Sequence, residues 1–200
     1  MAPPDPTATR RALRHVRRDL TLVERDAAHR AVSAALLAEP ALRRARRIGA
    51  YFAQGGELDL EPFLHAKLDS GREVYLPRLA GSGERMRFAR FLPGVSLARN
   101  RFGIPEPARD APVVAARFLD AVLLPLVAFD AVGTRLGSGA GYYDRCFAFR
   151  ASRRYWHAPL LIGVAFACQE VPSLPRRHWD VPLDAVVTER GFHRFPGPAR

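Results

Sequence analysis

The sequence predicts an α/β fold, built as a single three-layer α/β/α domain with a mostly parallel central sheet. Three observations support this prediction. Segments with helical spacing alternate along the 200 residues with short apolar segments typical of strands. Residues 119–129 form a nearly continuous apolar run, as expected of a central strand covered on both faces. A glycine-rich loop follows this run and leads into a predicted helix.

Two helices are predicted near the N-terminus. Over residues 9–19 apolar side chains recur at helical spacing, with arginines on the other faces: Leu13, Val16 and Leu20. Thr21 followed by Glu24 has the form of a capping box, in which the hydroxyl and the carboxylate satisfy free amides at a helix start. A second helix is therefore expected to begin there and to run to about residue 38.

The remaining elements follow in alternation. A buried strand is expected at 48–53, a helix at 59–69, and a strand at 73–76 that Pro77 closes. Residues 79–109 are expected to be irregular, with one strand at about 86–91. After the apolar run come a helix from about Tyr142, a buried strand at 160–167 and a short last strand at 185–188.

The chain is long enough for one domain, expected at residues 10–190 between a disordered leader at 1–9 and a tail at 191–200. The leader lacks the apolar core of a secretory signal, and no stretch approaches the length of a membrane span. The two cysteines, Cys146 and Cys168, show no metal-binding spacing. These features favour a cytoplasmic protein.

The formal net charge of +11 raises the question of an anionic partner such as a nucleic acid. Almost all of the positive charge is arginine, since Lys67 is the sole lysine. Such a bias more often reflects genome base composition than selection for a binding surface. The chain also lacks a basic stripe interleaved with aromatic residues. A basic RNA-binding protein is therefore a secondary hypothesis, and no specific nucleic-acid partner is expected.

The sharpest local motif runs from Arg135 to Arg145 and reads RLGSGAGYYDR. Alternating glycines let the backbone turn tightly and present several N–H groups, which favours phosphate oxygens at the start of the next helix. Arg135 adds a charge beside this loop, and Asp144 could hold a magnesium ion that bridges the phosphates. The alternative is a glycine-rich turn whose acidic residue favours the helix dipole.

Two further groups of residues could contact a ligand. Arg10, Arg14 and either Arg17 or Arg18 share a face of the first helix and could bind a polyanion, although a solvated charged face is the alternative. Glu57 lies just past a predicted strand end, where open α/β sheets bind ligands, although it could instead cap the next helix.

Other metal and nucleophile motifs are weaker. Asp180 could complete a metal shell with Asp144, or could lie in an ordinary turn before an X-Pro unit. The six histidines form no pair with zinc spacing. Ser138 lies between glycines without the spacing of a nucleophile elbow, and Cys146 lies inside a predicted helix, where packing in the core is expected.

Together these motifs resemble the 5-formyltetrahydrofolate cyclo-ligase family, also called methenyltetrahydrofolate synthetase, in order and spacing over residues 10–189. The general marks are the basic first helix, GELD at 56–59, VYLP at 74–77 and GIPEP at 103–107. The most specific marks are PLVAFD at 125–130, the glycine motif at 135–145 and WDVPL at 179–183.

This resemblance implies an enzyme that uses ATP and Mg²⁺ to convert 5-formyltetrahydrofolate into 5,10-methenyltetrahydrofolate, with release of ADP and phosphate. ATP would phosphorylate the formyl oxygen to an imidate-type intermediate, which N10 of the folate attacks as phosphate leaves. Positioning and charge neutralisation would provide most of the catalysis. The expected partner is the folate, with or without a polyglutamate tail, and the expected state is a monomer with no membrane contact.

By matching positions, the resemblance also implies the roles of individual residues. ATP contacts fall on the basic helix and the glycine loop: Arg10, Arg14, Arg135, Leu136, Gly137, Ser138, Gly139, Ala140, Gly141, Tyr142 and Tyr143. Folate contacts fall on Arg14, Phe52, Glu57, Phe102 and Tyr142. Glu57 would accept hydrogen bonds from the pterin ring, and Phe102 stands where some members have tryptophan. Asp144 and Asp180 match the magnesium ligands, and Arg135 and Tyr142 are assigned catalytic roles.

One departure concerns charge in the glycine loop, where some members carry Arg and Lys and this chain has Ser138 and Ala140. Arg145 and Arg99 are the candidates to compensate. The main alternative function is a folate or nucleotide binder that has lost ligase activity. The chain retains Asp144, Asp180, Glu57 and Arg135, which such a binder would not need. Their presence argues against this alternative.

Overall fold

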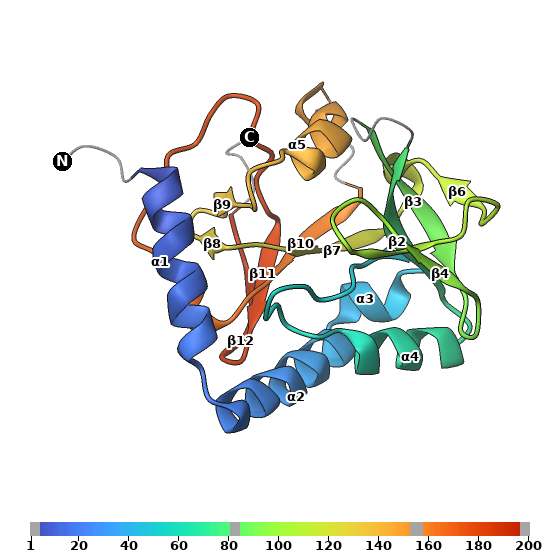
Figure 1. The fold of residues 1–200 in the computed structure, drawn as a ribbon, viewed down its shortest axis with the longest axis horizontal. Helices are drawn as coiled ribbons and strands as arrows, with labels where there is room; N and C mark the ends of the chain where they lie inside the picture. Colours follow the sequence, from blue (N-terminus) through green and yellow to red (C-terminus); the bar gives the residue numbers. More distant parts are fainter. Residues whose placement is uncertain (1–4, 81–84, 153–157, 197–200) are drawn as a thin grey trace.

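The computed structural model describes residues 5–80, 85–152 and 158–196, and an eight-stranded sheet runs through the centre of this part of the chain (Figure 1). The strand order is β12-β11-β10-β7-β1-β2-β3-β6. The five strands from β11 to β2 are parallel, and the outer strands pair antiparallel. Their bounds are β1 Arg47–Gly49, β2 Glu73–Ala80, β3 Arg85–Phe91, β6 Val113–Val114, β7 Ala121–Pro125, β10 Leu160–Val164, β11 Ala185–Thr188 and β12 Gly191–Arg194. The predicted α/β class with a mostly parallel sheet is confirmed.

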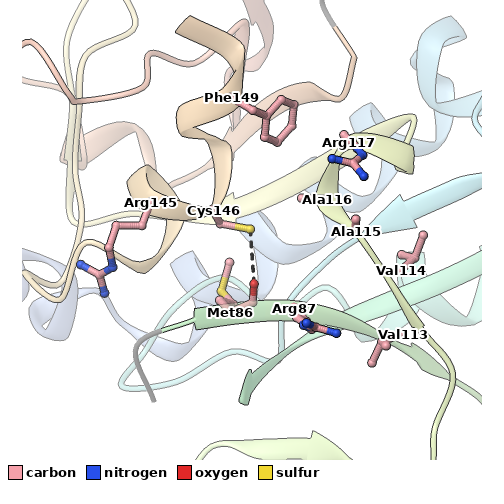
Figure 2. Close-up of a pocket in the computed structure, with 10 residues that line it drawn as sticks. All are labelled: Met86, Arg87, Val113, Val114, Ala115, Ala116, Arg117, Arg145, Cys146 and Phe149. Atoms are coloured by element: carbon pink, nitrogen blue, oxygen red, sulfur yellow. Dashed lines mark hydrogen bonds between the residues drawn. The ribbon is translucent and has the colours of Figure 1, made fainter. Parts of the chain in front are cut away.

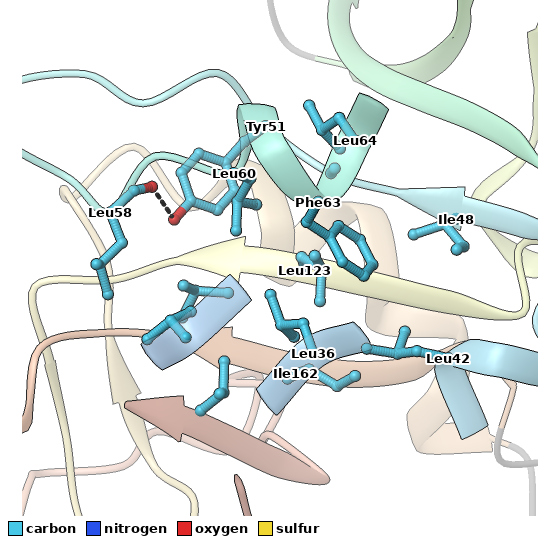
Figure 3. Packing of buried hydrophobic residues seen from close by; sticks show 14 of the residues in the cluster. Leu36, Leu42, Ile48, Tyr51, Leu58, Leu60, Phe63, Leu64, Leu123 and Ile162 are labelled. Carbon is cyan, nitrogen blue, oxygen red and sulfur yellow. Dashed lines mark hydrogen bonds between the residues drawn. The ribbon is translucent and has the colours of Figure 1, made fainter. Parts of the chain in front are cut away.

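Helices cover both faces of this sheet, which confirms the three layers (Figure 1). One face carries α2 (Leu22–Ala38), α3 (Pro40–Arg44) and α4 (Glu61–Asp69), and the other carries α5 (Tyr142–Phe147). Successive side chains of β7 enter different cores, as a strand requires: Leu123 packs with Phe63 of α4, and Leu124 packs with Phe147 of α5. Figure 3 shows the first of these cores.

The first helix, α1 (Pro6–Asp19), begins earlier than predicted. Asp5 is its N-cap, because the Asp5 carboxylate accepts hydrogen bonds from two backbone N–H groups of the first turn, both at 3.1 Å. Residues 5–9 of the predicted leader therefore belong to a capped helix, while residues 1–4 lie outside the described residues. The capping box is confirmed: Thr21 Oγ1 accepts from the Glu24 N–H at 3.2 Å, and Glu24 Oε2 accepts from the Thr21 N–H at 2.8 Å.

Two strands differ in length from their predictions. β1 stops at Gly49, four residues short of the predicted end at residue 53. β2 continues through Pro77, which was predicted to close it. β1 pairs with β2 only as far as Tyr75, so the missing N–H of Pro77 removes no bond of that ladder. Leu79, on the same side of β2, donates its N–H to Glu106 Oε1 at 3.0 Å.

The apolar run at 119–129 was predicted to be one strand, but the structure divides it into two. β7 ends at Pro125, and β8 (Ala128–Phe129) then pairs with β9 (Arg135–Leu136) in a separate hairpin. The buried Asp130 carboxylate holds the hairpin turn by accepting the Thr134 N–H at 2.9 Å. It also accepts the Leu174 N–H at 3.0 Å from a distant loop. The hairpin places the glycine motif beside the end of the sheet.

Two segments predicted to be irregular contain strands. Within residues 79–109, β4 (Leu97–Arg99) and β5 (Pro105–Pro107) form a two-stranded sheet in addition to β3. Residues 191–194 form β12 rather than a tail, and Phe195 is buried in the core with α5. None of the helices in the described ranges combines the length and apolarity that crossing a membrane requires.

Candidate active site

The predicted site residues gather at the carboxyl ends of the parallel strands, where open α/β sheets bind ligands. The segments that follow β1, β7 and β10 meet at this edge. Helix α1 lies alongside it, in contact with β8 and with the turn Ala167–Gln169 (Figure 1). The basic face of α1 is thereby brought to loops that are far away in the sequence.

The glycine loop after β9 contacts α1 directly. Arg10 Nε donates a hydrogen bond to the Gly137 carbonyl oxygen at 2.8 Å. A Cβ atom at Gly139 would lie 3.7 Å from Arg10 Cζ, and Gly139 has φ +113°, a conformation that side chains rarely adopt. Gly141, with φ +65°, then precedes α5. Arg10 and the loop backbone, predicted separately to bind phosphate, therefore face the same space.

Arg135 is paired rather than free. Its side chain is 4% exposed, and its Nη2 lies 2.6 Å from Asp144 Oδ1. Arg135 Nε is also buried, with no acceptor among the described residues. A buried donor of a charged group without a partner is costly, so this atom favours an anionic ligand.

The two predicted metal ligands lie in adjacent segments. Asp144 Oδ1 accepts the N–H of Val181 at 3.2 Å, and Val181 follows Asp180 in the chain. Asp180 Oδ2 accepts the N–H of Arg177 at 2.8 Å within its own turn. Within the described ranges no three His, Cys, Asp or Glu side chains form a metal cluster. Two carboxylates fit magnesium in a nucleotide site, where phosphates and water supply the other ligands.

Glu57 lies in a cationic and aromatic environment. Arg17 and Arg14 of α1 are near its carboxylate, as are Tyr51 and Tyr143. Burial raises the pKa of Glu57, and its hydrogen bond from the Gln54 N–H and the two arginines oppose this rise. Burial also raises the pKa of the Tyr143 phenol, as does the neighbouring Glu57 charge. Glu57 follows β1 and lies beside two cations, so its predicted role as a ligand acceptor stays a prediction.

Aromatic residues form a wall beside the glycine loop. Phe102 and Tyr142 meet edge to face, with ring centroids 6.3 Å apart. Arg101 Nη2 donates to the Tyr142 hydroxyl at 2.8 Å, and the Arg101 guanidinium lies 4.8 Å from the Phe102 ring centroid. Phe102 is 54% exposed, as an aromatic surface open to a ligand would be. Phe52, by contrast, packs edge to face against Phe91 at 5.4 Å.

The structure separates the residues that could compensate for Ser138 and Ala140. Arg145 lies over the Tyr142 ring at 5.1 Å, and its Nη1 would be 3.0 Å from a Cβ at Gly141. It is therefore beside the loop. Arg99 instead donates to the Gly103 carbonyl oxygen at 2.6 Å.

Sequence analysis left open whether Arg17 or Arg18 shares the basic face with Arg10 and Arg14. The structure distinguishes the two side chains. Arg17 is buried and donates to the Gly55 carbonyl oxygen at 2.7 Å, whereas Arg18 is exposed. Spacing could not decide between them, because Arg17 at i+3 and Arg18 at i+4 both share a face with Arg14. Arg25 of α2, which was not predicted, donates to the Gly56 carbonyl oxygen at 3.4 Å.

Two cavities lie beside β3, and Arg87 lines both. One, of about 530 Å³, lies between α5 and β3, where Cys146 points toward the Met86 carbonyl oxygen at 3.6 Å (Figure 2). The other, of about 560 Å³, lies between β2, β3 and the β4–β5 sheet near Phe102, and five arginines line it: Arg78, Arg87, Arg99, Arg101 and Arg109. Its one acidic residue, Glu106, is already bonded to Leu79 and to Asn100.

Known proteins resemble this chain over most of its length. A family model described as the 5-formyltetrahydrofolate cyclo-ligase family matches residues 4–189. A protein of that name from Haemophilus influenzae is 35% identical over 180 residues, which cover 89% of this chain and 94% of the relative. Its Escherichia coli counterpart is 35% identical over 88% of this chain and 96% of the relative. The NMR structure of Aquifex aeolicus 5,10-methenyltetrahydrofolate synthetase is similar with a TM-score of 0.81 and 31% identity, covering 98% of this chain and 95% of that chain.

Proposed function

The chain belongs to the 5-formyltetrahydrofolate cyclo-ligase family and is a ligase of folate metabolism; on this basis we propose that it uses ATP and Mg²⁺ to cyclise 5-formyltetrahydrofolate to 5,10-methenyltetrahydrofolate. In the proposed reaction the γ-phosphoryl group passes to the formyl oxygen and ADP leaves. N10 then attacks the formyl carbon of this imidate-type intermediate. The carbon–oxygen bond breaks, phosphate departs, and N10 loses its proton.

The contact between Arg10 and Gly137 carries the ATP part of this proposal. It brings a cation from α1 to a loop 127 residues further along the chain, whose glycines leave backbone N–H groups accessible. Arg135 and Arg145 add positive charge beside the same loop. Phosphate oxygens would satisfy the buried Arg135 Nε, which has no acceptor among the residues described.

Magnesium, when bound, would neutralise phosphate charge and align the transferring group. Asp144 and Asp180 would hold it. Arg135 orients Asp144 through the 2.6 Å contact with Oδ1, and the second carboxylate oxygen is left for the ion. This arrangement makes Arg135 a positioning residue for the metal as well as a donor to phosphate.

The folate would lie between Glu57 and the aromatic wall. Glu57 would accept N–H groups of the pterin, and Phe102 and Tyr142 would pack against the aromatic part of the substrate. Phe52 packs on Phe91. It lies two residues after Ala50, just past the carboxyl end of β1, and would border the pterin. Arg101 donates to the Tyr142 hydroxyl, so the O–H of Tyr142 is free to donate to the reacting formyl group.

The arginine-lined cavity of about 560 Å³ near Phe102 would receive the glutamyl tail of the folate. Carboxylates of a polyglutamate would pair with the guanidinium groups that line this cavity. We expect a longer tail to lower KM for the folate, and Arg87→Gln with Arg109→Gln to remove that gain. Arg117→Gln, at an exposed arginine of the other cavity, is the control. An equal KM for mono- and polyglutamates would overturn this assignment.

The reaction is tested by mixing the protein with 5-formyltetrahydrofolate, ATP and Mg²⁺ and following the near-ultraviolet absorbance of the methenyl product. Formation that depends on both ATP and metal supports the proposal. Arg10→Gln should then raise KM for ATP about tenfold through loss of one charged contact, while the exposed neighbour variant Arg11→Gln should not. Binding of folate and ATP without product would favour a binder that has lost activity, and binding of neither would refute the site.

The proposal also places the enzyme in the cytoplasm as a monomer. Both cysteines are free in the structure, in keeping with a reducing compartment. Light scattering at micromolar concentration would test the monomer. Salt-sensitive RNA binding at physiological ionic strength would instead favour a nucleic-acid role for the basic surface.

A further inference from the structure

Arg17 is a charged side chain in an unusual place, because it is only 6% exposed. Burying a guanidinium is costly unless its donors are satisfied. Its Nη2 donates to the Gly55 carbonyl oxygen at 2.7 Å. Its Nε is buried and meets no acceptor within the part of the chain that the structure describes. A purely structural arginine would be expected to have its donors paired.

The segment that Arg17 contacts is the turn from Gln54 to Glu57. Gly55 and Gly56 have φ of +56° and +81°, so the turn depends on two glycines in a conformation that other residues rarely adopt. Gln54 and Glu57 close it, since the Glu57 N–H donates to the Gln54 carbonyl oxygen and the Gln54 N–H donates to Glu57 Oε2, both at 3.1 Å. Arg17 is therefore bonded within the turn that presents Glu57.

Helix α2 supports this arrangement. Arg25 donates to the Gly56 carbonyl oxygen at 3.4 Å, to the Leu20 carbonyl oxygen at 3.1 Å and to the carbonyl oxygen of Arg17 itself. Two arginines from two helices thus hold successive carbonyl groups of the same turn. The position of Arg17 is fixed from both sides.

The charge of Arg17 also acts on Glu57. The groups that face the Glu57 carboxylate are Arg17 and Arg14 from α1, Tyr51 from the segment after β1, and Tyr143 from α5. The Tyr51 hydroxyl donates to the Leu58 carbonyl oxygen at 3.0 Å and so is not directed at Glu57. Burial raises the pKa of Glu57, and Arg17 opposes this rise more strongly than Arg14 does.

We propose that Arg17 is a positioning residue for the folate, which fixes the Gln54–Glu57 turn and keeps Glu57 a carboxylate that accepts N–H groups of the pterin. This inference rests on the proposed function, in which Glu57 contacts the substrate. It assigns a specificity role to a residue of α1 that lies one turn beyond the two arginines at the nucleotide.

The test compares Arg17→Gln and Arg17→Lys with Arg18→Gln, an exposed arginine of the same helix. KM for 5-formyltetrahydrofolate and for ATP is measured from pH 6 to pH 9. Without the Arg17 charge the pKa of Glu57 rises further, so the carboxylate is lost at a higher pH than in the wild type. We expect Arg17→Gln to raise the folate KM about tenfold, with a larger rise toward pH 6 than toward pH 9 and the ATP KM within about twofold. Arg17→Lys should restore part of the loss, and Arg18→Gln should match the wild type.

Glu57→Gln keeps the inference falsifiable if Arg17→Gln does not fold. In Glu57→Gln the folate KM should rise at every pH from 6 to 9, because no carboxylate remains to titrate, and an unchanged folate KM would overturn the inference. An equal rise of both KM values in Arg17→Lys would also overturn it, because the defect would then be general. Equilibrium titration with 5-formyltetrahydrofolate alone separates the two proposals. No binding by the wild type refutes the proposed function, whereas wild-type binding that Arg17→Gln leaves unchanged refutes only the role of Arg17.

Discussion

Replacing Asp144 with asparagine should affect turnover and stability together, because its carboxylate has two roles. Asp144 Oδ1 accepts from Arg135 Nη2 at 2.6 Å and from the Val181 N–H at 3.2 Å. Asparagine retains an acceptor oxygen for both bonds but removes the charge that neutralises Arg135, whose side chain is 4% exposed. Removing one partner of a fully buried pair costs about 3–5 kcal/mol. Because the Asp144 side chain is 20% exposed and both hydrogen bonds can persist, we expect the free energy of unfolding to fall by about 2 kcal/mol.

For a domain of this size, about 2 kcal/mol corresponds to a fall in Tm of about 4–8 °C, measured by circular dichroism without ligands. Turnover at saturating Mg²⁺ should fall about 100-fold or more, since an electrostatic contact to the transition state is lost. Asp180→Asn is the matched control: among the described residues its carboxylate bonds only to the backbone of its own turn, so turnover should fall while Tm changes by less than in Asp144→Asn. Unchanged turnover in Asp144→Asn would remove this residue from the metal site, and an unchanged Tm would refute the stabilising pair.

Three further predictions concern other parts of the structure. Gly139→Ala should weaken ATP binding about tenfold in calorimetry, because φ of +113° strains a side chain that would also face Arg10; unchanged affinity would contradict the loop geometry. Gly163→Ala should lower Tm by about 4–8 °C with ATP affinity unchanged, since the new Cβ would lie 2.7 Å from two leucine methyl carbons, an overpacking of about 2 kcal/mol. Burial raises the pKa of Cys146 to about 12, so at pH 8 about one thiol in 10⁴ is ionised. Alkylation of Cys146, followed by peptide mass spectrometry, should therefore be slow in the native protein and accelerate about tenfold per pH unit, and rapid labelling at pH 8 would show that the thiol is accessible.

Local patterns in the sequence predicted local structure well. The capping box at Thr21 involves residues three positions apart, so every atom that determines it is present in the pattern. The glycine motif is also local, but its spacing left phosphate binding and a capped turn as alternatives, and the family resemblance favoured the first. The N-cap at Asp5 is equally local, but the Pro- and Ala-rich composition around it was interpreted as disorder, and that interpretation was wrong for residues 5–9.

Features set by distant partners could not be predicted in this way. Whether Pro77 ends a strand depends on β1 stopping opposite Tyr75, and whether residues 191–194 form a strand depends on a free edge at β11. The pairing of Arg135 with Asp144 and the burial of Arg17 rather than Arg18 depend equally on tertiary packing. The sequence therefore could predict which residue types gather at this end of the sheet, but not the partners of individual charges.

The bond between Arg10 and Gly137 has a consequence for how the protein is made. It closes a loop of 127 residues, so the two halves of the proposed nucleotide site are synthesised far apart in time. On the ribosome α1 emerges first, and it cannot meet its loop until β7, β9 and the start of α5 have also left the exit tunnel. During that interval the arginines of α1 are solvated and without their partners. If the proposed ATP site is correct, ATP binding would therefore be acquired late, and it would report that the chain has folded from α1 to the glycine loop.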